Sequence, residues 1–141
     1  MISYLYNAGK VALLKGQIDL TGGAIRVALV TSGYAGNKDS HDFFNDVTNE
    51  VSGTGYTAGG KTLVSAAVNQ DNTNERAVLT ASDVVWPVAT FTARGAVLYK
   101  GTGSAATSPL IAFIDFGEDR SVAGQDFSIV WHQDGILYLG E

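Results

Sequence analysis

The chain has 141 residues, of which 45% are hydrophobic and only 16% charged, and its formal net charge is -5. This length predicts one domain, residues 1–141, with one sizeable core, and the acidic balance argues against nucleic-acid binding, which depends on Lys and Arg at phosphates. The absence of cysteine excludes disulfides and thiolate metal sites, and without a long apolar run we expect neither a membrane span nor a signal segment.

The N-terminal segment, residues 1–16, is expected to be helical. Ser3 can cap a helix over Ser3–Lys15, and Gly16 stands where helices commonly end. Gly9 is the weak point of this prediction because glycine is a poor helix former. Apolar residues recur at helical spacing, at Leu5, Ala8, Ala12 and Leu13.

Short strands separated by polar turns are expected before position 88. The run AIRVALVT, residues 24–31, alternates as a strand does, whereas residues 32–53 are mostly polar and predict a long loop with one helical turn. Further extended segments are expected at Lys61–Val68, Arg76–Thr80 and Asp83–Pro87. The last should end or bulge at its proline, which cannot donate to a ladder.

The stretch Val88–Gly117 predicts a central antiparallel pair around which the chain is organised. The small residues GTGSAATS form the expected surface loop, and Pro109 suits the first position of a strand. Ile111 and Phe113 give the second strand two apolar faces, so it should lie inside a sandwich or against another subunit. Period 2 predicts one shared face on each strand, with Phe91, Ala93, Val97 and Tyr99 on the first and Leu110, Ala112, Ile114 and Phe116 on the second.

The run FSIVWHQDGILYL predicts a closing hairpin that turns at Asp134–Gly135. Its first strand should carry Phe127, Ile129 and Trp131 on one face. The strands lack the intervening helices of a parallel sheet. The predicted fold class is therefore all-β, a β-sandwich or jelly-roll-like arrangement over residues 24–141 with one N-terminal α-helix.

The string GYTAGGKT, Gly55–Thr62, satisfies the phosphate-loop pattern, and LIAFID ending at Asp115 resembles a magnesium-binding strand. A working phosphate loop needs a buried strand before it and a helix after it. Here NEVSGT precedes the motif and the strand-like TLVSAAV follows it, so a glycine-rich β connection is the favoured interpretation.

The evidence for the other candidate functional residues is equally weak. Asp39, His41, Asp42 and Asp46 match no calcium-loop spacing and indicate a solvated acidic loop. His41 and His132 are the only imidazoles, and spacing nominates no catalytic triad. Trp86 and Trp131 could stack on a sugar, but a core or interface anchor is the commoner role. We therefore nominate no catalytic, cofactor-binding or metal-binding residue and expect a protein that is not an enzyme.

Several segments carry a resemblance in the same order and spacing: EVSGTGYTAGGKTL, ASDVVWP with TFTARGAVLYK, TSPLIAFIDFGED and FSIVWHQDGIL. Together with the N-terminal KVALLKGQIDL, they resemble a family of small structural proteins of tailed bacteriophages. The resemblance implies a virion component without catalytic residues, a capsid decoration or cement protein at the capsid surface. The alternative is a tail-associated or fibre module that binds a host receptor glycan.

The resemblance implies binding to the major capsid protein, with no nucleic acid, membrane or small-molecule substrate as partner. A homo-oligomer, trimer or dimer, is expected because apolar strands and aromatic residues would leave surface uncovered on a monomer. The N-terminal arm, residues 1–6, should help to bind the shell, and its deletion should leave the β domain folded. The expected interface residues are Ile2, Tyr4, Leu5, Tyr6, Tyr56, Trp86, Trp131 and His132.

Overall fold

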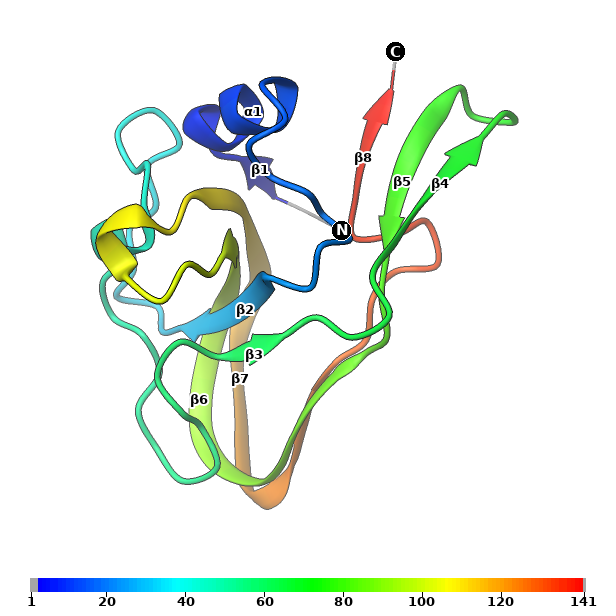
Figure 1. Cartoon of the computed structure of the whole chain (residues 1–141). Helices are drawn as coiled ribbons and strands as arrows, with labels where there is room; N and C mark the ends of the chain where they lie inside the picture. The colour runs from blue at the N-terminus through cyan, green and yellow to red at the C-terminus, as the bar shows by residue number, and fades with distance from the viewer. Residues whose placement is uncertain (1–2, 141) are drawn as a thin grey trace.

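A computed structural model describes residues 3–140 of the chain (Figure 1). Its elements are β1 (Tyr4–Leu5), α1 (Asn7–Leu14), β2 (Ile25–Val30), η1 (Phe44–Asp46), β3 (Lys61–Thr62), β4 (Ala67–Asp71), β5 (Arg76–Thr80), β6 (Val84–Lys100), η2 (Ala105–Thr107), β7 (Leu110–Ile129) and β8 (Leu137–Gly140).

The strands form two antiparallel sheets. Five strands follow the order β1-β7-β6-β2-β3, and three follow the order β4-β5-β8. The main hydrophobic core draws residues from both, such as Leu29 of the larger sheet and Leu79 of the smaller. The prediction of an all-β, sandwich-like fold with one N-terminal helix is confirmed.

The central pair is confirmed as β6 and β7, and it is longer than expected. Both strands bend sharply at the bottom of Figure 1 and rise on the side of β5, so one continuous ribbon connects the two parts of the fold. The ladder is irregular between Trp86 and Ala89, and Val88 has a φ of 49° there. This is the bulge expected at Pro87, because proline cannot complete the ladder.

A second irregularity overturns the predicted shared face of β6. The register shifts between Ala93 and Gly95, and the alternation of the strand is reset. Ala93 therefore faces the main core, whereas Val97 and Tyr99 face a second, aromatic cluster. A shift between Leu98 and Tyr99 likewise separates the predicted shared face of β7, since Leu110 joins the aromatic cluster and Ala112 and Ile114 join the main core.

The first half of β7 is covered on both faces, as its two apolar faces predicted. Ile111 and Ile114 are buried in the main core, and Phe113 is buried in the aromatic cluster with Tyr6 and Tyr34. The Tyr6 and Tyr34 hydroxyl groups share a hydrogen bond of 2.7 Å. Loss of contact with water raises the pKa of Tyr34 to about 12, so this pair stays neutral over the ordinary pH range.

The N-terminal prediction needs two corrections. The helix begins at Asn7, because residues 4–5 instead pair with Phe113 and Ala112 of β7 as a short strand. Ser3 caps no helix: its hydroxyl accepts a hydrogen bond from the Asp115 N–H at 2.7 Å. The expected end is confirmed, since Gly16 follows the helix with a φ of 71°. The predicted role of the arm also includes residues 1–2, which lie outside the described residues.

Two strand predictions are wrong. The expected strand Lys61–Val68 is broken, because Ser65 has a φ of 57° and separates β3 from β4. The closing hairpin is absent: β7 stays paired with β6 as far as Ile129, and β8 crosses to pair with β5. The turn itself is confirmed, since Gly135 has a φ of 99° and its N–H donates to the His132 carbonyl.

Candidate protein-docking groove

An apolar groove of about 480 Å³ separates α1 from one face of the three-stranded sheet. The strand register determines which side chains lie on that face. Leu137 lies opposite Leu79, and Leu79 lies opposite Val68, so these side chains point the same way. The same rule puts Ala77 and Leu139 beside them. We call this the apolar groove; its lining is completed by Leu5, Lys10, Leu13, Leu14 and Leu20, and by Tyr138, which lies between the two leucines of β8 and turns its ring to the other face of the sheet.

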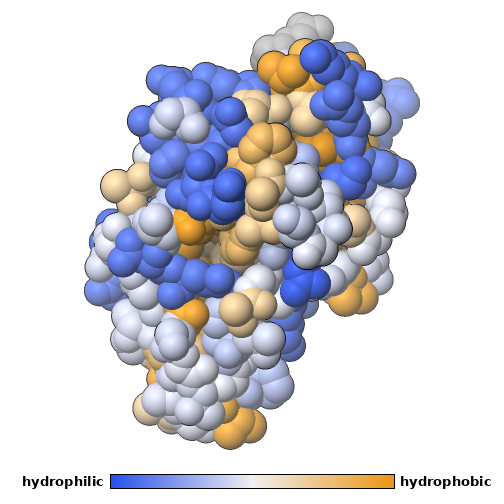
Figure 2. Space-filling model, turned by 60° about the vertical axis from the view of Figure 1, so that its left-hand side comes forward, coloured by the Kyte–Doolittle hydropathy of each residue, from blue (hydrophilic) through white to orange (hydrophobic). Residues whose placement is uncertain are grey.

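The inner end of the apolar groove is closed and its outer end is open. Leu79 and Leu137 are buried, but Leu14 is 82% exposed and Leu139 is 70% exposed. Val68 and Tyr138 are also about half exposed. Figure 2 shows apolar side chains at the top of the molecule, the end where β8 and α1 lie in Figure 1. Burying each exposed leucine would contribute about 1.5–3 kcal/mol, so this surface favours a protein partner.

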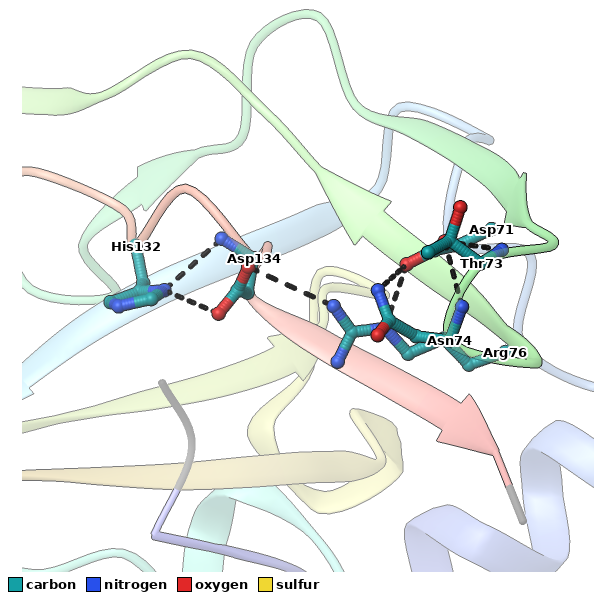
Figure 3. Close-up of polar contacts among 6 residues, drawn as sticks. All are labelled: Asp71, Thr73, Asn74, Arg76, His132 and Asp134. Carbon is teal, nitrogen blue, oxygen red and sulfur yellow. Dashed lines mark hydrogen bonds and ion pairs between the residues drawn. The ribbon is translucent and has the colours of Figure 1, made fainter.

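A network of polar side chains lies on the opposite face of the small sheet (Figure 3). Asp71 accepts from Arg76 Nε at 3.0 Å and from Asn74 Nδ2 at 2.9 Å, and Arg76 Nη2 lies 3.8 Å from Asp134. The Asn74 side chain, with Arg76 and nearby backbone N–H groups, lowers the pKa of Asp71. This network ties the β4–β5 turn to the turn before β8 and so supports one wall of the groove.

His132, an expected interface residue, stands at the end of that network. Its side chain is 54% exposed, and Nδ1 lies 3.4 Å from Asp134 Oδ2. Nδ1 also accepts a hydrogen bond from the Asp134 N–H at 3.1 Å. The His132 side chain is therefore accessible to a partner, but it lies beside the polar network and not in the apolar groove.

A second hollow, of about 610 Å³, is lined by the Gly55–Thr62 motif and the β6–β7 loop; the side of the molecule seen in Figure 2 is visibly hollowed. Arg26 donates to the Gly60 carbonyl at 2.8 Å and to Thr62 Oγ1 at 3.0 Å. Glu50 accepts from the Gly59 N–H at 2.7 Å. The loop is thus held by separate hydrogen bonds to Arg26 and Glu50, and the Gly59 N–H, a donor that a phosphate loop would offer to its ligand, is already occupied.

The surroundings of the motif also depart from a phosphate loop. Residues 61–62 form β3 directly after the glycines, and no α-helix follows them within residues 63–140. Lys61 Nζ donates to the Val85 carbonyl instead of pointing into the loop. These features fit the predicted glycine-rich β connection.

The acidic loop is held by hydrogen bonds within the protein. Asp46 accepts from the N–H groups of Asp42 and Phe43, which lowers the pKa of Asp46. His41 Nδ1 bonds the Tyr34 hydroxyl at 2.9 Å, and Asp39 accepts from the Asn7 side chain. Among the described residues, no three acidic or histidine side chains gather as metal ligands.

Three of the other seven expected interface residues belong to the interior. Tyr6, Trp86 and Trp131 are at most 8% exposed, and the Trp131 indole N–H donates to the Ser82 carbonyl at 3.0 Å. Their side chains offer no surface to a partner in this conformation, which corrects the expectation for these three. Ile2 lies outside the described residues.

The remaining three are half-buried. Tyr56 donates to Glu50 and accepts from the Leu29 N–H at 3.0 Å, so its hydroxyl serves the fold. The Tyr4 ring packs 5.5 Å from that of Phe113. Leu5 alone lines the apolar groove. Four exposed apolar residues, Val11, Leu14, Val68 and Leu139, were not identified from the sequence. Val11 and Leu14 could have been found from the sequence, because they are apolar residues outside the apolar stripe predicted for the helix.

Comparison with protein-family models, with curated proteins and with solved structures gives no match. Across residues 3–140 no helix is long and apolar enough to cross a membrane, since α1 has only eight residues.

Proposed function

We propose that this chain is a structural protein of a tailed-bacteriophage virion, a capsid decoration protein that acts by binding and not by catalysis. In this role it sits on the assembled shell of the major capsid protein and stabilises it. The resemblance of several ordered sequence segments supports the phage assignment.

The single observation that carries a binding role is the apolar groove. A monomer with Leu14 and Leu139 largely exposed leaves apolar area in contact with water, and association removes that area. The lining of the groove also carries little charge, since Lys10 is its one charged residue. Such a surface suits protein packing in a regular assembly.

A decoration protein stabilises the shell because it binds the assembled lattice and not the free subunit. A site with submicromolar affinity contributes on the order of 8 kcal/mol. Repetition over a lattice makes the total large. Loss of the protein should therefore lower the temperature at which the shell opens while leaving attachment to cells unchanged.

The test is to add the purified full chain to capsids that lack it. Saturable binding that raises the temperature of DNA release supports the proposal. The alternative, a tail module that binds a receptor glycan, predicts no binding to shells, and particles without the protein would keep their thermal resistance but lose adsorption.

A further inference from the structure

We infer that a second copy of this chain covers the apolar groove, joined to the first by antiparallel pairing of β8 with its counterpart. The inference rests on the proposed function in one respect, namely that the chain is a subunit of an assembly. It goes further by naming the partner at the groove.

The first observation is an unguarded strand edge. β8 is the outer strand of the order β4-β5-β8, and within residues 3–140 it pairs with β5 alone. Edge strands that must stay unpaired usually carry charges, proline or bulges. The second half of β7, which extends beyond its pairing with β1 and pairs with β6 alone, follows that rule with Glu118, Asp119 and Arg120, whereas Leu137–Gly140 contains no charged residue and no proline.

The second observation is that β8 is apolar on both faces at this edge. Leu139 is exposed on the groove face, and Tyr138 is exposed on the other face, where its ring packs 4.7 Å from the Arg76 guanidinium carbon. A water-facing edge strand would normally be polar on one side. Two exposed apolar faces indicate that β8 is an interior strand of a larger sheet.

Symmetry determines the register of that larger sheet. Opposite residues in an antiparallel pair share a face, so the groove faces of two copies are continuous only if Leu137 and Leu139 lie opposite each other or themselves. Among these registers, the one that pairs both leucines puts Tyr138 opposite the second copy's Tyr138, and Leu137 opposite the second copy's Leu139. The contact is isologous, as in most homodimers.

This pairing would join two small sheets into one, with the grooves of both copies on the same face. The strand pair alone is too small for the roughly 800 Å² per partner that a stable interface buries. The apolar wall formed by α1 must therefore enter the same contact, through Leu14, which is largely exposed. A second copy can supply the missing buried area, because its own groove face is also apolar and also exposed to water.

A cysteine cross-link tests the register directly, because the chain has no cysteine of its own. Tyr138→Cys would bring two thiols to the two-fold axis, where Cα atoms about 4.5–5.5 Å apart permit a disulfide. Val88→Cys, at a comparably exposed residue of β6, is the matched control. We expect rapid formation of a disulfide-linked dimer for the first variant and not for the second.

Sedimentation of the unmodified chain gives the second readout. We expect a dimer whose dissociation constant rises at least about tenfold in Leu139→Arg and stays the same in Val88→Arg, with equal urea midpoints showing that both variants fold. A monomer at high micromolar concentration, a trimer, or a dimer insensitive to Leu139→Arg would overturn the inference. Failure to bind shells with the dimer intact would instead overturn the proposed function alone.

Discussion

Gly9 of α1 lies directly against the backbone of Leu110 at the start of β7, so closely that a Cβ at position 9 would overlap the Leu110 carbonyl oxygen. Gly9 lowers the intrinsic helix propensity of α1, but its lack of a side chain allows the helix to pack directly against the sheet. This contact positions α1 as one wall of the apolar groove.

Gly9→Ala should therefore destabilise the protein. In an exposed helix this substitution would gain about 1 kcal/mol, but overpacking against the Leu110 backbone typically costs 1–3 kcal/mol. We expect a lower free energy of unfolding, measured in urea. A stabilised variant would show that α1 is not held against β7.

Deletion of residues 1–6 should unfold or strongly destabilise the chain, in contrast to the expectation from sequence. Tyr6 is fully buried and hydrogen-bonded to Tyr34, and residues 4–5 pair with β7. Loss of a buried aromatic side chain alone costs about 3–5 kcal/mol. Thermal unfolding followed by circular dichroism measures the effect. Deletion of Met1 and Ile2 alone is the control, and an equal loss in both variants would contradict the role of Tyr6.

Lys61→Ala should leave the fold nearly intact and should remove no nucleotide affinity, because the Gly59 N–H is already bound by Glu50. Titration calorimetry with magnesium and ATP should give no heat of binding for either protein. Micromolar affinity that disappears in Lys61→Ala would restore the phosphate-loop interpretation.

Stability should decline in acid, below about pH 4, where carboxylates protonate. Hydrogen bonds lower the pKa values of Asp46, Asp71 and Asp115 in the folded chain. A lowered folded-state pKa stabilises the protein while the group is ionised, and that contribution is lost as the pH falls. Asp71→Asn should reduce the acid sensitivity of urea unfolding. An unchanged dependence of the unfolding free energy on pH in this variant would contradict a contribution from Asp71.

The sequence was most informative where one local pattern dominates. Alternation in residues 24–31 and in the central pair predicted β2, β6 and β7, and Pro87 predicted its bulge. Bulges elsewhere were hidden, because the reset near Gly95 depends on packing against β7 and leaves no mark in composition.

The groove was missed for a related reason. Its lining comes from residues 5–20, from the neighbouring strands β4 and β5, and from β8 at the other end of the chain. The turn at Gly135 predicts that β8 pairs with the strand that precedes it. A turn fixes where the chain reverses, but not which strand it then joins. Trp86 and Trp131 are large aromatic residues of a kind common at interfaces, yet both pack in the main core.

The most direct test of a capsid decoration role is the number of copies per virion, measured by quantitative mass spectrometry of purified particles against the major capsid protein. The account predicts hundreds of copies, in a fixed ratio to the shell subunit. A count of a few or a few tens, as expected for a tail component, would contradict it.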